Sequence, residues 1–257
     1  MTKHTVLVTG ASSGIGMELA RQFAQQGHSL VLLARRRKQL DALALELQER
    51  YMVAAHVLEA DLCDLQTPST IVRELERRNL QVDVLVNNAG FGLLGPHATL
   101  DTQRQLDMVQ VNISAVVHLT RLLLPGMLKR NTGGVLNVAS TAAFQAGPNM
   151  AIYYATKAFV LSYSEALHEE VCGTQLRVSC LCPGPTHTGF VAVAGMEGVG
   201  LFKLGAQSAE EVARIGISAF QNNRTIAVSG FKNSAMVILG KVSPRYVTRK
   251  VAQFLNR

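Results

Sequence analysis

Short, continuous apolar runs alternate with longer amphipathic stretches along most of this chain. Runs typical of buried strands occupy residues 6–8, 29–34, 53–59, 82–86, 134–139 and 176–181, and a weaker run occupies 225–228. Between them, apolar side chains recur at helical spacing from the first glycine-rich loop to residue 27, and over residues 36–50, 65–78, 102–129, 152–171 and 209–221. Strands that are apolar on both faces indicate a parallel sheet with helices on both sides.

This alternation is not interrupted by a linker rich in proline, glycine or serine, and the sequence contains no internal repeat. We therefore predict a single α/β domain over residues 1–257, with a doubly wound, mostly parallel sheet of seven strands. In such folds, ligands bind beyond the carboxyl ends of the strands. The loops that leave the strands are accordingly where functional residues are expected.

The net charge of +7 is unevenly distributed along the chain. No acidic residue follows Glu211, whereas eight basic residues do: Arg214, Arg224, Lys232, Lys241, Arg245, Arg249, Lys250 and Arg257. The rest of the chain is nearly neutral, which argues against a nucleic acid as the partner of the whole domain. Aromatic residues are also sparse, at 5% with no tryptophan, so a base-stacking platform is not expected.

The four cysteines, Cys63, Cys172, Cys180 and Cys182, are irregularly spaced. We expect reduced core thiols and no metal site, because no second cluster of cysteine and histidine matches them. The first apolar run, residues 5–9, is too short for a secretory signal. No continuous apolar run approaches the length of about 18 residues that a membrane span needs. The cytoplasm, a reducing compartment, is therefore the expected location.

A glycine-rich loop follows the first strand and leads into the first helix. Gly10, Gly14 and Gly16 are spaced Gly-x3-Gly-x-Gly, with Ser12, Ser13 and Ile15 between them. Such a loop allows a tight turn and a close approach of the backbone to a pyrophosphate, which the amino end of the helix then stabilises. The position of the loop favours a dinucleotide site over an ordinary glycine-rich turn.

The end of the second strand distinguishes NAD from NADP as the cofactor. Proteins that bind NAD usually place a carboxylate there to hold the ribose hydroxyls. This chain instead has Arg35, Arg36, Arg37 and Lys38. We expect Arg35 and Arg36 to pair with a 2′-phosphate, so that NADP(H) is preferred and NAD(H) remains usable. The alternative is that these cations only solvate the start of the second helix.

Three further loops carry polar residues at strand ends. Asn87–Gly90 follow the fourth strand, Ser140 follows the fifth and Pro183–Thr188 follow the sixth. Tyr153 and Lys157 are four residues apart and share one helix face, but Tyr154 is three residues from Lys157. Spacing alone therefore leaves both tyrosines as candidates.

Together these motifs resemble the short-chain dehydrogenase/reductase family over residues 4–190. The resemblance is carried by Thr9–Gly16, Asp61–Leu62, Asn87–Gly90, Asn112, Ser140, Tyr-x3-Lys at 153–157 and Pro183–Gly184. It implies a Rossmann fold, hydride transfer between a nicotinamide and a carbonyl or secondary alcohol, and assembly as a homodimer or homotetramer. Ser13 departs from the pattern, because many NADP-binding members have a basic residue there.

The resemblance also implies roles for individual residues. Tyr153 would be the general acid and base, Lys157 would lower its pKa and hold the nicotinamide ribose, Ser140 would bind the substrate oxygen, and Asn112 would support a water relay. The cofactor would be contacted by Gly10, Ser12, Ser13, Gly14, Ile15, Gly16, Arg35, Arg36, Asp61, Leu62, Asn87, Ala89, Gly90, Tyr153, Lys157, Pro183, Gly184, Thr186 and Thr188. A non-catalytic dinucleotide-binding regulator on the same fold is the alternative function.

Two segments are less well defined by the sequence. Residues 189–207 alternate apolar side chains with glycines, which predicts a lid over an apolar pocket for a ketone or a 3-oxo or 3-hydroxy compound. Phe91, Leu93 and Leu94 could form the facing wall. In the basic tail, residues 231–257, an apolar stripe of Val247, Val251, Phe254 and Leu255 lies opposite Arg249 and Lys250. Packing of this tail on its own domain or on a second subunit is favoured over contact with a membrane surface.

Overall fold

The computed structural model describes residues 3–190, 194–195 and 205–256, and its centre is a parallel sheet of seven strands. The strand order is β3-β2-β1-β4-β5-β6-β7, and every neighbouring pair runs parallel. The strands are β1 (Thr5–Thr9), β2 (Ser29–Ala34), β3 (Ala55–Glu59), β4 (Val84–Asn87), β5 (Gly134–Val138), β6 (Arg177–Cys182) and β7 (Ile226–Val228). The predicted doubly wound sheet is therefore confirmed, with shifts of one or two residues at most strand ends.

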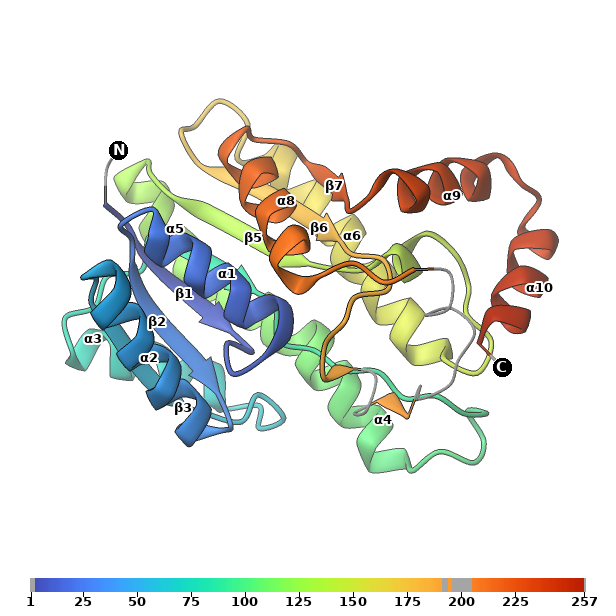
Figure 1. Cartoon of the computed structure of the whole chain (residues 1–257), viewed down its shortest axis with the longest axis horizontal. Coiled ribbons are helices and arrows are strands. Elements are labelled where there is room, and N and C mark those ends of the chain that lie inside the picture. The colour runs from blue at the N-terminus through green and yellow to red at the C-terminus, as the bar shows by residue number, and fades with distance from the viewer. Residues whose placement is uncertain (1–2, 191–193, 196–204, 257) are drawn as a thin grey trace.

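Helices cover both faces of this sheet (Figure 1). One face carries α1 (Gly14–Gln25), α2 (Arg37–Tyr51) and α8 (Ala209–Gln221), whose Phe23, Leu40 and Phe220 share one hydrophobic core. The other face carries α3 (Thr67–Arg77), α5 (Ala115–Arg130) and α6 (Ala151–Glu170), which contribute to a second core. Burial of apolar side chains on both faces explains why the strands read as continuous apolar runs.

The helix predicted over residues 102–129 is interrupted by one wider turn. It consists of α4 (Thr102–Val109), the π-helical turn η1 (Gln110–Ser114) and α5. By length and composition, the stretch Thr102–Arg130 could cross a membrane, with a mean hydropathy of 1.4. However, Leu119 and Met127 are almost fully buried in the core beside the sheet, as expected for a packed core helix.

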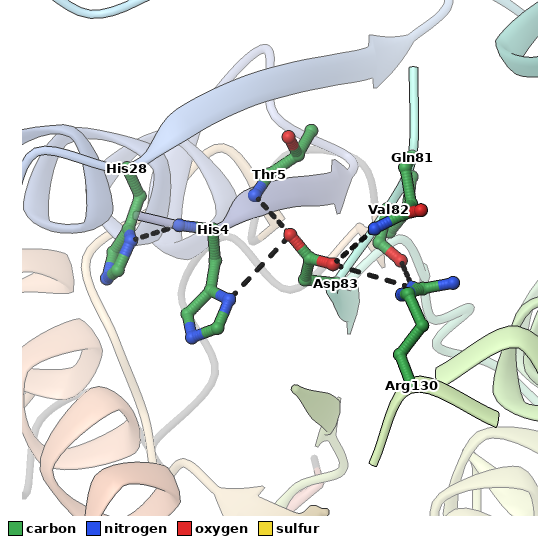
Figure 2. A network of polar contacts seen from close by, with 7 residues as sticks. All are labelled: His4, Thr5, His28, Gln81, Val82, Asp83 and Arg130. Atoms are coloured by element: carbon green, nitrogen blue, oxygen red, sulfur yellow. Dashed lines mark hydrogen bonds and ion pairs between the residues drawn. The ribbon is translucent and has the colours of Figure 1, made fainter. Parts of the chain in front are cut away.

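A polar network joins β1, β4 and α5 at the amino edge of the sheet (Figure 2). The Asp83 carboxylate accepts a hydrogen bond from the Thr5 backbone N–H at 3.0 Å and lies 3.4 Å from the Arg130 guanidinium. Arg130 also donates to the Val82 carbonyl at 2.7 Å. Burial lowers the pKa of His28, whose Nδ1 accepts the His4 backbone N–H. This network stabilises the edge opposite the predicted ligand site.

Two helices follow β7 and extend beyond the carboxyl ends of the strands (Figure 1). These are α9 (Phe231–Val242) and α10 (Arg245–Leu255), and we call residues 231–256 the C-terminal arm. The predicted amphipathic helix corresponds to α10, whereas the sequence analysis did not delimit α9. The end of α10 returns to the body, where the Asn256 side chain donates to the Pro148 carbonyl at 3.0 Å.

Candidate active site

The loops that carry the predicted motifs leave β1, β4, β5 and β6, which lie side by side in the sheet. Starting from β1, the next two strands, β2 and β3, are added on one side of the sheet. The strands from β4 to β7 are added on the other side, so the order of strands reverses between β1 and β4. In doubly wound sheets, this switch point opens a crevice at the carboxyl edge. The predicted site residues therefore meet where a dinucleotide binds in other folds of this class.

The glycine loop lies directly against the β4 loop. Gly10 and Gly14 have positive φ angles of 68° and 57°, which residues with side chains rarely adopt. A Cβ added to Gly16 would collide with the Asn88 side chain, so only glycine fits there. The α1 helix starts at Gly14, and its first N–H groups have no side-chain cap. This loop is therefore shaped to receive an anion such as a pyrophosphate.

Asn88 holds the loop in place, although the sequence analysis did not single it out. Its side chain donates to the Thr9 carbonyl at 2.9 Å, and the Thr9 hydroxyl accepts the backbone N–H groups of Asn88 and Ala89. The predicted contact Asn87 differs, because its side chain is buried and donates to Thr120 and Asn137. The Asn87 side chain therefore belongs to the core, and only its backbone remains for a ligand.

The two predicted phosphate-binding arginines occupy different surroundings. Arg36 donates to the hydroxyls of Ser12 and Ser13 at 3.0 and 2.6 Å, which places a guanidinium on the glycine loop. Arg35 is 67% exposed and lies 3.7 Å from the Asp61 carboxylate. Both cations are thus available at one end of the loop, where a phosphate on the adenosine ribose would lie. Leu62, by contrast, packs in the hydrophobic core, so its side chain is not available to a ligand.

The β6 loop closes the other side of the glycine loop. The Thr188 side chain lies against Gly14, since a Cβ added there would be 3.0 Å from it. The Thr186 hydroxyl donates to the Gly184 carbonyl at 2.9 Å, and the Pro183 carbonyl accepts the Thr141 N–H at 2.8 Å. Gly184 faces Asn233 of α9 so closely that no Cβ fits between them. The predicted β6 residues therefore connect the glycine loop to the C-terminal arm.

Asn112 lies in the π-helical turn and joins three segments. Its side-chain oxygen accepts the Phe91 N–H at 3.1 Å, and its amide donates to the Phe91 carbonyl and to the Thr156 hydroxyl, each at 3.0 Å. Gly90 approaches both Asn112 and Lys157, because a Cβ at Gly90 would be 3.4 Å from the Lys157 Nζ. Wider turns of this kind are frequent at functional sites. The turn brings the Asn112 side chain into contact with Thr156, the residue that precedes Lys157.

Lys157 is a buried cation with one hydrogen-bond acceptor identified around it. Its Nζ donates to the Val138 carbonyl at 2.9 Å and lies 5.9 Å from the centre of the Tyr153 ring. Burial lowers the pKa of Lys157 to about 8, although the nearby thiols of Cys180 and Cys182 act in the opposite direction. An ammonium group held here is therefore poorly solvated and able to interact strongly with an added polar ligand.

Tyr153 is the tyrosine that faces Ser140 and Lys157. Burial raises the pKa of Tyr153 to about 12, and the neighbouring Ser140 hydroxyl acts in the opposite direction. The expectation that the chain lowers this pKa through Lys157 is thus wrong for the protein alone, because desolvation is the larger effect. Ser140 also accepts the Ala142 N–H at 3.1 Å, which fixes its hydroxyl at the end of β5.

Tyr154 is excluded from the same role by its own partner. Its ring is buried, and its hydroxyl donates to the Asn256 side chain at 3.2 Å. The two neighbouring tyrosine rings meet at an angle of 77°, so their hydroxyls point to different surroundings. The Tyr154 hydroxyl is therefore already engaged, whereas Tyr153 lies beside Ser140 and Lys157.

The same combination of fold and motifs occurs in known proteins. The profile of the short chain dehydrogenase family matches residues 4–197. This chain belongs to the short-chain dehydrogenase family. It is 37% identical over 182 residues to the NADP-dependent 3-hydroxy acid dehydrogenase of Salmonella typhi, covering 70% of this chain and 71% of that protein.

Two further relatives of this short-chain dehydrogenase are a reductase with a different name and a protein of solved structure. A very-long-chain 3-oxoacyl-CoA reductase of Anas platyrhynchos is 36% identical over 182 residues, covering 69% of this chain and 58% of that protein. A solved short-chain dehydrogenase from Sphingobium yanoikuyae, in complex with NADPH, superposes with a TM-score of 0.81 at 29% identity, covering 94% of this chain and 96% of that chain. The similarity to the solved structure therefore extends over the C-terminal part as well as the glycine loop.

On the substrate side of this short-chain dehydrogenase, apolar groups surround Tyr153. The Phe190 ring lies 5.3 Å from the Tyr153 ring, and a Cβ at Gly92 would touch Phe190, Met150 and Tyr153. A small pocket beside Tyr153 is lined largely by apolar residues, among them Leu93 and Met108. Three residues were predicted to face the lid across the pocket. Leu93 lines the pocket and Leu94 packs with Tyr153 and Phe190. Phe91 instead packs against the core.

Part of the predicted lid, residues 191–193 and 196–204, lies outside the described residues, so the lid remains a prediction. Within the predicted lid, the Ala194 carbonyl accepts the Leu94 N–H at 3.0 Å, and at the end of the lid Gln207 bridges to Thr186. Within residues 3–190, 194–195 and 205–256, no group of three His, Cys, Asp or Glu side chains is arranged to hold a metal ion.

The bond between Tyr154 and Asn256 should govern how firmly α10 is attached. Replacing Asn256 with alanine removes a buried hydrogen bond to Tyr154 and a partly buried one to Pro148, which together contribute about 2 kcal/mol. We expect amide hydrogen exchange in α10 to accelerate about 30-fold, while exchange in the sheet stays unchanged. Tyr154→Phe removes only one of these bonds and should have a smaller effect. Equal exchange in both variants and the wild type would contradict this attachment.

Proposed function

We propose that this protein is an NADP(H)-dependent oxidoreductase that interconverts a carbonyl compound and a secondary alcohol. The observation that carries this proposal is that Ser140 neighbours Tyr153 and that the Lys157 Nζ lies 5.9 Å from the centre of the Tyr153 ring. A non-catalytic dinucleotide-binding protein would not need a tyrosine, a serine and a buried lysine to converge at this point. The cofactor supplies the hydride, and the chain supplies the proton and the stabilisation of charge.

The proton would come from Tyr153. Reduction of a carbonyl produces an alkoxide, which must be protonated, and a phenol with its pKa raised to about 12 remains fully protonated at neutral pH. Ser140 would donate a hydrogen bond to the same oxygen while negative charge develops on it. The two hydroxyls thus define the position of the reacting oxygen from two sides.

Lys157 and Asn112 would support the proton donor. A buried ammonium beside the tyrosine favours the phenolate that forms after proton transfer, and the same ammonium can bind the ribose hydroxyls of the cofactor. Asn112 already bonds to Thr156 and approaches Gly90, so it holds the lysine environment in place. Alcohol oxidation would use the same groups in reverse, with Tyr153 as the base.

The surroundings of Tyr153 and the names of two relatives indicate the chemical class of the substrate. The surroundings of Tyr153 are apolar, through Met150, Leu94 and Phe190. Two relatives carry names that specify a 3-hydroxy acid and a 3-oxoacyl thioester. We therefore propose a 3-oxo or 3-hydroxy compound, or an apolar ketone, as the substrate class.

The test is a matched panel of ketones, 3-oxo esters and secondary alcohols, followed by absorbance of the reduced nicotinamide. Each compound is offered with NADPH or NADP⁺ and, separately, with NADH or NAD⁺. We expect turnover of at least one carbonyl with NADPH. Tight binding of NADPH without turnover of any compound would favour a regulatory function instead.

The cofactor preference can be tested at Arg35 and Arg36. Charge-assisted hydrogen bonds to a phosphate contribute about 1.5–3 kcal/mol. The double variant Arg35→Ala/Arg36→Ala should therefore lower kcat/KM with NADPH by about a hundredfold and leave kcat/KM with NADH nearly unchanged. Arg37→Ala is the matched control, because Arg37 is bonded to Asp41 on its own helix. An equal loss with both cofactors would remove these arginines from the phosphate site.

We also propose that the protein is a cytoplasmic homodimer or homotetramer. Cys63, Cys172, Cys180 and Cys182 are all free, which fits a reducing compartment. Leu122 and Leu128 of α5 and Phe159 of α6 are exposed, so these helices offer an apolar face to a second copy. Light scattering should show a particle of two or four chains, and Leu122→Glu should reduce its mass. A monomeric wild type would overturn this part of the proposal.

A further inference from the structure

The C-terminal arm carries an unusual concentration of exposed apolar side chains. Sixteen large apolar residues are exposed in the described part of the chain, and nine of them lie on this arm: Phe231, Met236, Ile238, Leu239, Val242, Tyr246, Val247, Val251 and Phe254. Apolar patches of this extent on a monomer usually mark an interaction site. Phe231, Val242 and Phe254 are each more than 75% exposed, so the body of the protein does not cover them.

The apolar stripes of the two helices face away from the protein body. In α9, Phe231, Ile238 and Val242 recur at seven and four residues along one side, whereas Asn233 and Val237, on the opposite side, are buried. In α10, Val247, Val251 and Phe254 form the exposed stripe, and the helix contacts the body through Ala252 and the following Asn256. The attachment of the arm therefore uses other residues than its apolar stripes.

The charge of the arm restricts what can cover these stripes. Lys232, Lys241, Arg245, Arg249 and Lys250 are all exposed, and the sequence has no acidic residue after Glu211. A symmetric contact between the arms of two copies would bring only like charges together, with no carboxylate on either arm to pair with them. The exposed leucines of α5 are also flanked by cations, Arg121 and Lys129. A nucleic acid would match the charge but not the apolar stripes.

We propose that the C-terminal arm docks on an anionic lipid surface, with its apolar stripes in the interfacial region and its cations among the headgroups. A helix pair with an apolar stripe flanked by lysine and arginine has the composition of helices that lie in a membrane interface. Four to eight cations on such a segment attract acidic lipids, each with a modest contribution. The long side chain of Lys250, which lies over the Tyr246 ring of the arm itself, can reach the headgroups while its stem stays on the apolar side.

This docking would also position the proposed active site. The arm is attached to the body at Gly184, through Asn233, and at Tyr154, through Asn256. Gly184 is itself a predicted cofactor contact, and Tyr154 directly follows Tyr153. A protein held by this arm would therefore keep the apolar surroundings of Tyr153 close to the lipid surface.

The test is co-sedimentation of the full chain with vesicles of phosphatidylcholine, with and without phosphatidylglycerol. We expect binding to the anionic vesicles, little binding to the neutral ones and weaker binding at high salt. Arg249→Glu/Lys250→Glu and, separately, Val251→Ser/Phe254→Ser should each lower the partition coefficient about tenfold or more. Met52→Ser and Arg73→Glu are matched controls, since both residues are exposed and lie outside the arm; they should bind like the wild type.

Three outcomes would overturn the proposal. Equal binding to neutral and anionic vesicles would remove the role of the cations, and absence of binding to either would remove the lipid surface. If the arm variants change the mass of the particle in light scattering and the wild type ignores vesicles, then the stripes are an interface between copies. None of these measurements depends on turnover, so they stand apart from the proposed oxidoreductase activity.

Discussion

Replacement of Tyr153 by phenylalanine is expected to lower kcat for carbonyl reduction by about a thousandfold. Positioned proton donors contribute between about a hundredfold and ten-thousandfold to such reactions, and phenylalanine keeps the ring while it removes the proton that would be transferred to the substrate oxygen. The dissociation constant of NADPH should change little, because Lys157 and the glycine loop remain in place. Steady-state kinetics and fluorescence titration of NADPH measure the two quantities separately.

Tyr154→Phe is the matched control for this experiment. It removes the same hydroxyl from the adjacent residue, where the hydroxyl bonds to Asn256 rather than facing Ser140. We expect Tyr154→Phe to keep most of the turnover. A reversed pattern, with turnover lost in Tyr154→Phe and kept in Tyr153→Phe, would show that the two tyrosines have been assigned to the wrong roles.

Replacement of Lys157 by methionine is expected to lower kcat at least a hundredfold and, at the same time, to stabilise the fold. Burial lowers the pKa of this lysine from 10.5 to about 8, so holding it charged at neutral pH costs about 3 kcal/mol. Methionine has a similar length and no charge to desolvate. Loss of the hydrogen bond to the Val138 carbonyl costs about 1 kcal/mol, which leaves a net stabilisation of about 2 kcal/mol.

The sign of this effect can be followed with pH. The lysine of the unfolded chain keeps its proton up to about pH 10.5, whereas the folded protein loses it near pH 8. Within this window the unfolded state binds more protons, so the wild type gains stability as the pH rises. The advantage of Lys157→Met, measured as a Tm difference of about 4–8 °C at pH 7, should therefore shrink between pH 8 and 10.5. A variant that is less stable than the wild type at pH 7 would show that the site stabilises the ammonium.

The strands and the positions of the proposed catalytic residues could be predicted because their signals are local. A strand covered on both faces must be apolar throughout, and the loops that follow such strands converge at one edge of the sheet. Ser140 and the Tyr153–Lys157 pair could be placed from these two facts and from the family motifs. Spacing alone could not choose between Tyr153 and Tyr154, since both lie about one helical turn from the lysine; the family motif made that choice.

Other features depend on residues far apart in the chain. The bond between Tyr154 and Asn256 joins positions 102 residues apart, and the bonds between Asn88 and Thr9 join positions 79 residues apart. No periodicity or spacing records such contacts. The pKa of Tyr153 was predicted in the wrong direction for a related reason, since desolvation depends on everything that packs around the ring.

The π-helical turn at Gln110–Ser114 joins α4 to α5 and is wider than a regular helical turn, with one additional residue. One additional residue in a helix shifts all that precedes it by about 100° relative to all that follows. The wider turn takes up this additional residue, so α4 keeps the face that carries Met108 on the pocket beside Tyr153; a regular helix with the same number of residues would turn that face away. Designed chimeras that exchange α4 between relatives must therefore conserve the length of this turn, even where its sequence differs.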